Sequence, residues 1–183
     1  MSERYKYKQY KFLAPEQLHA ALAEVVALAK KEGVHMALAG GYAMQQYGSP
    51  RLTGDVDVVA SETVRALKGK ALTFGGRRTK ATAGVPVDII VRSDDAKDLY
   101  EAALASAVNI GGPCPVVRPE FMAAIKLEAG RKKDEDDLEF LIVARRIDIP
   151  KARAIIKQYL GWFAAKEFDS YVAEAQWKAS REK

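Results

Sequence analysis

Two neighbouring segments decide the fold: ALAGGYA at residues 37–43 and RLTGDVDVV at residues 51–59. Residues 34–39 form a short, mainly apolar run, which predicts a short buried strand. Gly40 and Gly41 end this strand in a turn whose backbone can approach a ligand closely, because neither residue has a Cβ atom. A helix then begins, and its first amides lack partners within the helix. The turn is therefore a candidate phosphate-binding site.

The second segment places two aspartates on the next predicted strand. Asp55 and Asp57 are separated by one residue, and side chains alternate along a strand, so both carboxylates point to the same face. A divalent cation is the usual reason for two like charges at such a position. Mg²⁺ prefers one or two carboxylates together with the phosphate oxygens of a substrate. The pattern predicts a site for Mg²⁺ or Mn²⁺ at Asp55 and Asp57.

A third acid interrupts a strand that is otherwise apolar. Residues 85–91 read VPVDIIV, which is typical of a central strand. Asp88 is expensive to bury there unless another group pairs with it. If this strand is an antiparallel neighbour of the preceding one, Asp88 lies beside Asp55 and Asp57. A surface-facing residue at a strand end is the alternative interpretation.

These residues together resemble the signature of the nucleotidyltransferase superfamily, which has a palm like that of DNA polymerase β. More narrowly, they resemble small bacterial nucleotidyltransferases related to abortive infection and to toxin–antitoxin systems. The resemblance implies an α/β (α+β) fold, in which a mixed, largely antiparallel sheet is flanked by helices and followed by a C-terminal helical extension. It also implies that the glycine turn holds the triphosphate of an NTP and that Asp55, Asp57 and Asp88 bind two metal ions. Many members have Gly-Ser where this chain has Gly40-Gly41, so a hydroxyl that could touch phosphate is missing.

A second block extends the resemblance to the toxin-related proteins. PEFMAAIKL at residues 119–127 and RKKDEDDLEFL at residues 131–141 resemble their Lys…Arg-x-Lys-Asp-x-x-Asp-Leu pattern. The resemblance implies that Lys126 contacts the triphosphate and that Asp134 and Asp137 support it. Acids in a first helical turn are also ordinary helix-start chemistry, so a structural role for both aspartates stays open. Arg51 is expected either to orient the acid strand or to touch phosphate.

Length and composition favour a globular chain with one core. The sequence has 183 residues, of which 49% are hydrophobic and 29% charged. We expect an α/β core with an N-terminal helix over residues 1–118, including a short helix from Ser61 or Glu62 to Gly69, and a helical region over residues 119–183. No apolar run approaches the roughly 20 residues of a membrane span, and no signal-peptide core follows the N-terminus, so we expect a cytoplasmic protein. A single cysteine and two histidines exclude an internal disulfide and argue against zinc chemistry.

The function that these observations predict is metal-dependent transfer of a nucleoside monophosphate from an NTP to an acceptor hydroxyl. The alternative is a catalytically weak nucleotide-binding or partner-binding module on the same fold, which the missing serine keeps open. A P-loop NTPase is poorly supported, because no Gly-Lys-Ser/Thr follows the glycine turn.

Basic residues suggest an RNA acceptor. Arg77, Arg78 and Lys80 precede Asp88, residues 131–133 are Arg-Lys-Lys, and the net charge is +5, so a basic rim around the acids would suit an RNA end. The resemblance points to tRNA and to an accompanying antitoxin protein. Residues 5–12 alternate aromatic residues with lysines and glutamine; this stretch could stack on bases, although an arm packed on the domain is the preferred interpretation.

Overall fold

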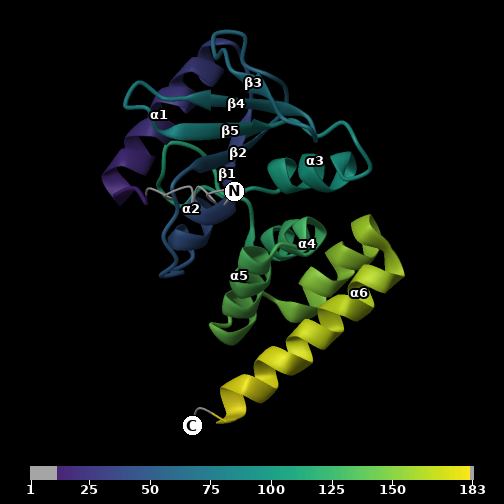
Figure 1. Cartoon of the computed structure of the whole chain (residues 1–183). Coiled ribbons are helices and arrows are strands. Elements are labelled where there is room, and N and C mark those ends of the chain that lie inside the picture. The colour runs from purple at the N-terminus through teal and green to yellow at the C-terminus, as the bar shows by residue number, and fades with distance from the viewer. Residues whose placement is uncertain (1–11, 182–183) are drawn as a thin grey trace, which may run out of the picture.

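The fold combines one mixed sheet with a separate group of helices (Figure 1). The structure is a computed structural model that describes residues 12–181, so most of the aromatic and lysine-rich stretch at residues 5–12 lies outside the described part. The described elements follow one another in this order: α1 (Pro15–Lys31), β1 (Met36–Ala39), α2 (Gly40–Gln46), β2 (Val56–Ala60), β3 (Lys70–Ala71), β4 (Gly76–Lys80), β5 (Pro86–Ile90), α3 (Lys97–Ala105), α4 (Pro119–Ala129), α5 (Lys132–Val143) and α6 (Ile149–Arg181).

The sheet has the strand order β1-β2-β5-β4-β3. Its pairs are antiparallel except β2 with β5, which are parallel, so the mixed, largely antiparallel sheet is confirmed. The expectation that the Asp88 strand runs antiparallel to β2 is wrong. The antiparallel ribbon of β3, β4 and β5 reverses the chain twice before β5, and β5 therefore runs in the direction of β2. The parallel register still sets Asp57 directly opposite Asp88.

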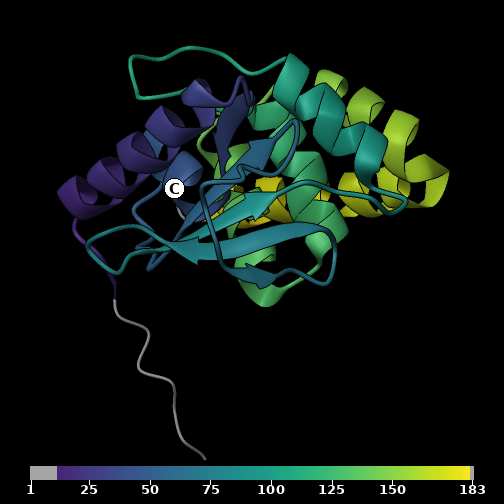
Figure 2. The ribbon, with the colours of Figure 1, turned by 90° about the horizontal axis from the view of Figure 1, so that it is seen from above.

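Apolar side chains of α1 and of the central strands form the core beneath the sheet. Leu18, Leu22 and Val25 recur at helical spacing along α1, and each is at most 1% exposed. Both α1 and α3 pack against β2, and they lie toward opposite ends of the strands (Figure 2). This packing holds β2 in place beneath the loop that carries Asp55.

The expectation of a short helix between Ser61 and Gly69 is wrong, because this segment forms turns and bends. The carboxylate of Glu32, at the end of α1, accepts hydrogen bonds from the backbone amides of Arg65 and Ala66 at 2.8 and 2.9 Å. Val64 and Leu67 are buried nonetheless, at 1% and 6% exposure. Tertiary hydrogen bonds therefore replace the partners that a helix would have supplied to this backbone.

Helices α4, α5 and α6 pack on one another and form the group below the sheet in Figure 1, which confirms the C-terminal helical extension. The long α6 is broken at Gly161, whose φ of 89° and ψ of −179° only glycine adopts readily. Of the helices within residues 12–181, none combines the length and the hydrophobicity that a membrane crossing requires.

A chain of buried ion pairs joins the helical group to the segment before β2. Lys126 on α4 donates hydrogen bonds from Nζ to Asp134 Oδ1 at 2.9 Å and pairs with Asp137 Oδ2 at 2.7 Å, both carboxylates lying on α5. The three side chains are at most 4% exposed. Arg51 then donates to both carboxylate oxygens of Asp137, at 2.7 and 2.9 Å. Two helices and the approach to β2 thus share one set of charges.

Replacing Lys126 by methionine should destabilise the protein, because two buried carboxylates would lose their shared ammonium group. We expect the free energy of unfolding to fall by about 2–4 kcal/mol. This lies toward the lower end of the losses measured for broken buried ion pairs, because each aspartate keeps an arginine partner. The matched control is Lys178→Met: Lys178 also pairs with two carboxylates, of Glu139 and Glu174, but is 42% exposed, so its loss should cost less than about 1 kcal/mol. Urea denaturation of both variants measures the difference, and equal losses would show that the burial of Lys126 has no special role.

Candidate active site

The glycine turn and the second aspartate of the acid pair are in direct contact. Gly40 has a φ of +61°, and a Cβ atom placed on it would lie 1.8 Å from Asp57 Oδ2. No other residue type could occupy this position without displacing the carboxylate. The turn therefore presents bare backbone beside Asp57, as the sequence predicted for a ligand-binding turn.

The two carboxylates of the acid pair lie close enough to repel each other. Asp55 directly precedes β2 and accepts a hydrogen bond from Thr53 Oγ1 at 2.8 Å through Oδ1. Burial, followed by the negative charges of Asp55 and Asp88, raises the pKa of Asp57 to about 6, while the positive charges of Lys126 and Lys133 act in the opposite direction. Among the residues that the structure describes, neither Asp55 nor Asp57 forms an ion pair. This part of the site carries negative charge that the protein does not neutralise by direct contact.

Asp88 lies beside Asp57, but an arginine holds it. Arg78 stands opposite Asp88 in the β4–β5 register, and its Nε and Nη2 atoms donate to the two carboxylate oxygens, each at 2.6 Å. Asp88 is 6% exposed, so the arginine supplies the partner that a buried acid requires. Both oxygens of the predicted third metal ligand therefore already accept a hydrogen bond.

Arg51 touches the turn as well as the helices. A Cβ atom on Gly41 would lie 2.9 Å from Arg51 Nη2 and 2.8 Å from Thr53 Oγ1. These two side chains fill the space that a larger residue at position 41 would need. Asp137 fixes the guanidinium through two hydrogen bonds. Arg51 therefore links the segment before β2 to α5, and its expected role in orienting the acids stays a prediction.

The predicted supporting acids are brought together with Lys126, as the ion-pair chain shows. Burial opposes ionisation of Asp134, but hydrogen bonds from Arg131 and Lys126 outweigh it and hold the pKa of Asp134 below its ordinary value. The Lys126 ammonium thus lies between two carboxylates and is 4% exposed. Both predicted supporting acids thus contact Lys126, and Asp134 also lies in the first turn of α5.

The predicted basic rim is largely engaged in contacts within the protein. Arg77 donates to the backbone oxygen of Leu67, Arg78 pairs with Asp88, and Arg131 pairs with Asp134. Lys132 pairs with Glu135 and Asp136. For Lys80 and Lys133, no ion pair is formed within residues 12–181.

Oxygen ligands for a cation are present at Asp55 and Asp57. Their uncompensated charge and their contact with bare backbone fit a divalent cation bound together with phosphate. Asp88 fits as a further ligand only if Arg78 releases it. In the described part of the chain, no group of three or more histidine, cysteine, aspartate or glutamate side chains is arranged to hold a metal ion.

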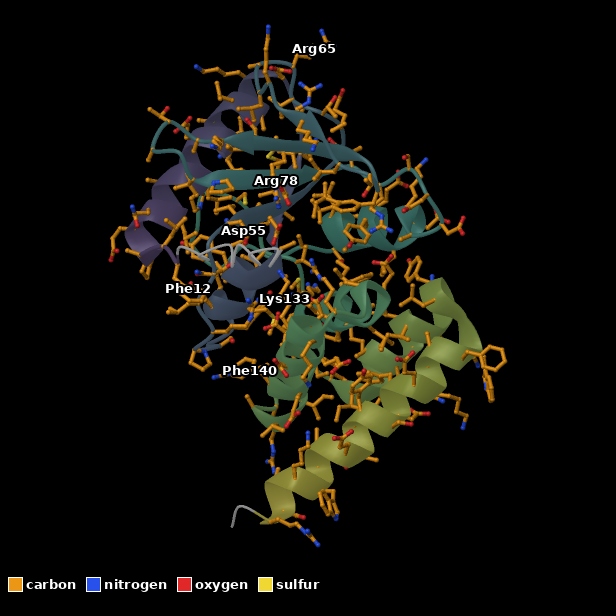
Figure 3. All side chains as sticks on the ribbon, in the orientation of Figure 1. Phe12, Asp55, Arg65, Arg78, Lys133 and Phe140 are labelled. Carbon is orange, nitrogen blue, oxygen red and sulfur yellow. The ribbon has the colours of Figure 1, made fainter. Side chains whose placement is uncertain are left out.

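Two features of the site were missed at the level of sequence. The pairing of Arg78 with Asp88 follows from the β4–β5 register, and the turn at residues 81–85 between two predicted strands was the signal that could have given it. Residues 131–133 were expected in the basic rim, but the sequence did not single out Lys133 as the member that forms no ion pair within the described residues, because that depends on how α5 packs. Figure 3 shows Lys133 at the end of α5 that is turned toward the sheet, with Asp55 and Arg78 above it.

A separate cavity lies away from these residues. It has a volume of about 700 Å³, is lined by Val26, Met36, Leu104 and Cys114 among others, and contains none of the predicted site residues.

Comparison with known proteins identifies the fold through structure alone. No protein-family model matches the sequence, and no curated protein matches it. A nucleotidyltransferase-like antigenic protein from Paracoccidioides brasiliensis is similar in structure, with a TM-score of 0.52 and 15% identity over 89% of this chain and 95% of that one. The antibiotic-resistance factor ANT(2'')-Ia is similar with a TM-score of 0.55 and 13% identity, over 86% of this chain and 99% of the other.

Both similarities cover most of this chain and nearly all of the compared protein, so they include the sheet and the helices below it. At these identities they establish a shared fold and no more. The chain has a nucleotidyltransferase-like fold, as the family resemblance of its glycine turn and acid pair implied.

Proposed function

We propose that the protein is a metal-dependent nucleotidyltransferase. One observation carries the proposal: Gly40 presents bare backbone against Asp57, beside a second carboxylate that no basic side chain of the described residues neutralises. A site without a ligand gains nothing from crowding two acids in this way, since their mutual repulsion raises the free energy of the folded state. A magnesium-bound triphosphate would supply both the missing positive charge and phosphate oxygens for the turn.

The residues of the chain divide the work as follows. Asp55 and Asp57 would hold Mg²⁺ or Mn²⁺, and the bound metal would activate the attacking hydroxyl and stabilise the leaving group. The Gly40-Gly41 turn would lie against the phosphates, and Arg51 would keep the acid segment in place through Asp137. The acceptor oxygen forms a bond to the α-phosphorus, and the bond to the pyrophosphate oxygen breaks.

Asp88 is the proposed acceptor of the proton that the attacking hydroxyl loses. In the structure its oxygens accept hydrogen bonds from Arg78. This role therefore requires the Arg78 side chain, which is 53% exposed, to turn away when substrate binds.

The acceptor that we propose is an RNA end. The net charge of +5 and the basic residues near the acids support it. Most of the predicted rim is paired with carboxylates, so the free positive charge is smaller than the sequence suggested. The accompanying antitoxin stays a prediction of the family resemblance.

The second candidate function is a binding module that does not turn over, and the Arg78–Asp88 pair favours it. If Arg78 stays in place, Asp88 can neither bind a metal nor accept a proton. Such a module would still bind a metal–triphosphate complex at Asp55 and Asp57. Only a transfer assay separates the two functions.

Incubation with Mg²⁺, each labelled ribonucleoside triphosphate and total RNA should transfer label to an acceptor. Asp57→Asn should lower the rate on the order of 10²-fold or more, by analogy with the loss of one preorganised electrostatic contact. Asp136→Asn is the matched control, because Asp136 is 59% exposed and its one ion pair within residues 12–181 is with Lys132. Resolving the label on RNA, protein and small molecules identifies the acceptor. Binding without transfer at any acceptor would establish the second candidate in place of the first.

Mg²⁺ and a triphosphate together should raise the melting temperature more than the sum of their separate effects. The reason is that the substrate supplies ligands to the metal, and binding to the native state alone stabilises it. A thermal-shift titration with Mg²⁺ or Mn²⁺ and each of the four triphosphates measures this, and Asp57→Asn should abolish the joint shift. No response to any combination would contradict nucleotide binding and both candidate functions.

In the absence of metal, Asp57→Asn should stabilise the protein, and more so at higher pH. The raised pKa of about 6 means that the folded state disfavours the carboxylate; this cost is absent below about pH 4 and complete above about pH 6. We expect a gain of about 1–3 kcal/mol at pH 8 and little gain at pH 4. Chemical denaturation in EDTA at both pH values measures it. A loss of stability at pH 8 would show that Asp57 is a structural acid.

A further inference from the structure

We propose that Lys133, rather than Lys126, supplies the ammonium group that binds the triphosphate. This assignment rests on the proposed function and deepens it. It replaces the expectation, implied by the family resemblance, that Lys126 on α4 reaches the phosphates.

The first argument is the placement of Lys126. Its Nζ atom lies 2.9 Å from Asp134 and 2.7 Å from Asp137, and the side chain is 4% exposed. To reach a phosphate, the ammonium group would have to leave two carboxylates that would then stay buried without it. Lys126 therefore acts as a positioning residue that fixes Asp137, and through it Arg51.

The second argument is the orientation of α5. Asp137 contacts Arg51, which leads into the acid segment, so this face of the helix is turned toward Asp55. Lys133 precedes Asp137 by four residues and lies on the same face. Helical side chains tilt toward the N-terminus of their helix, and here that end faces the sheet (Figure 3). The Lys133 side chain thus extends toward the acids, and after Lys126 it is the second lysine whose positive charge lowers the pKa of Asp57.

The third argument is availability. Arg51, Arg78, Arg131 and Lys132 each pair with a carboxylate. Within the described residues Lys133 pairs with none and is exposed. Lys80 is also unpaired there, but it lies on β4, which β5 separates from β2. Among the described cations near the acids, Lys133 can consequently bind a phosphate without breaking an existing ion pair.

A lysine also suits the task. The ammonium group is a compact charge on a flexible stem that can follow the phosphates as they move. Lys133 would neutralise charge on the terminal phosphates, opposite the metal at Asp55 and Asp57. The contact does not require any base, so it would be shared by all four nucleotides.

Calorimetry with Lys133→Met and Lys132→Met tests the assignment. The probes are Mg²⁺ with inorganic tripolyphosphate and Mg²⁺ with each ribonucleoside triphosphate. Lys133→Met should raise the Kd about tenfold or more, as expected for one lost charge-assisted contact. Lys132→Met removes the same charge from the neighbouring residue, which is 81% exposed and paired with Glu135 and Asp136, and should change the Kd by less than about twofold. Lys133→Arg should recover part of the affinity.

A second measurement does not depend on a variant. Acetylation of the wild-type protein by an amine-reactive ester, with and without Mg²⁺ and tripolyphosphate, should show protection of Lys133 while Lys132 stays reactive. Unchanged affinity in Lys133→Met, or an equal loss in Lys132→Met, would overturn the assignment and leave the proposed function standing. Failure of the wild-type protein to bind any probe would overturn both.

Discussion

The buried ammonium group of Lys126 is the constraint on which the rest of the site depends. Removing a charge from water costs several kcal/mol, and this cost is recovered only when partners stand at hydrogen-bonding distance. Here the partners come from α5, and one of them also binds Arg51, just before the acid segment. Burial of the Lys126 charge is therefore favourable only when α4, α5 and the segment before β2 are placed so that these contacts form. In that placement the end of α5 that carries Lys133 is turned toward the sheet.

Against this background the acid pair stands out. Asp88, Asp134 and Asp137 each have a basic partner at 2.5–2.9 Å, whereas Asp55 and Asp57 have none within residues 12–181. Arginine and lysine neutralise the other three carboxylates, yet within the described residues these two have no basic partner, and one of them lies against Gly40. Proteins retain unfavourable local electrostatics of this kind mostly at functional sites. The contrast between paired and unpaired acids is thus stronger evidence for a ligand than the Asp-x-Asp spacing by itself.

Much of the fold and part of the site could be predicted from local sequence. The glycine turn, the strand after it and the apolar strand around Asp88 follow from periodicity and from glycine positions. The direction of β5 and the turns at residues 61–69 did not follow, because the first depends on strand order and the second on hydrogen bonds from Glu32, a residue far away in the sequence. Lys126 illustrates the same limit: its place in the pattern was visible, but which of its neighbours it would contact depends on how α4 and α5 pack.

The contact between Arg78 and Asp88 then decides how the acid site can work. Arg78 is 53% exposed, and an arginine that is half in water recovers hydration when it leaves its partner, so holding Asp88 contributes little net free energy on the arginine side. Asp88 is the costly member, because it is 6% exposed and would be left buried and charged. A cation bound at Asp55 and Asp57, directly across the register from Asp88, would remove that cost by replacing one positive charge with another. Under the proposed function, Arg78 supplies positive charge to Asp88 in the metal-free protein and would be displaced when a metal and a triphosphate bind together; if it stays in place, the binding module is the function that remains.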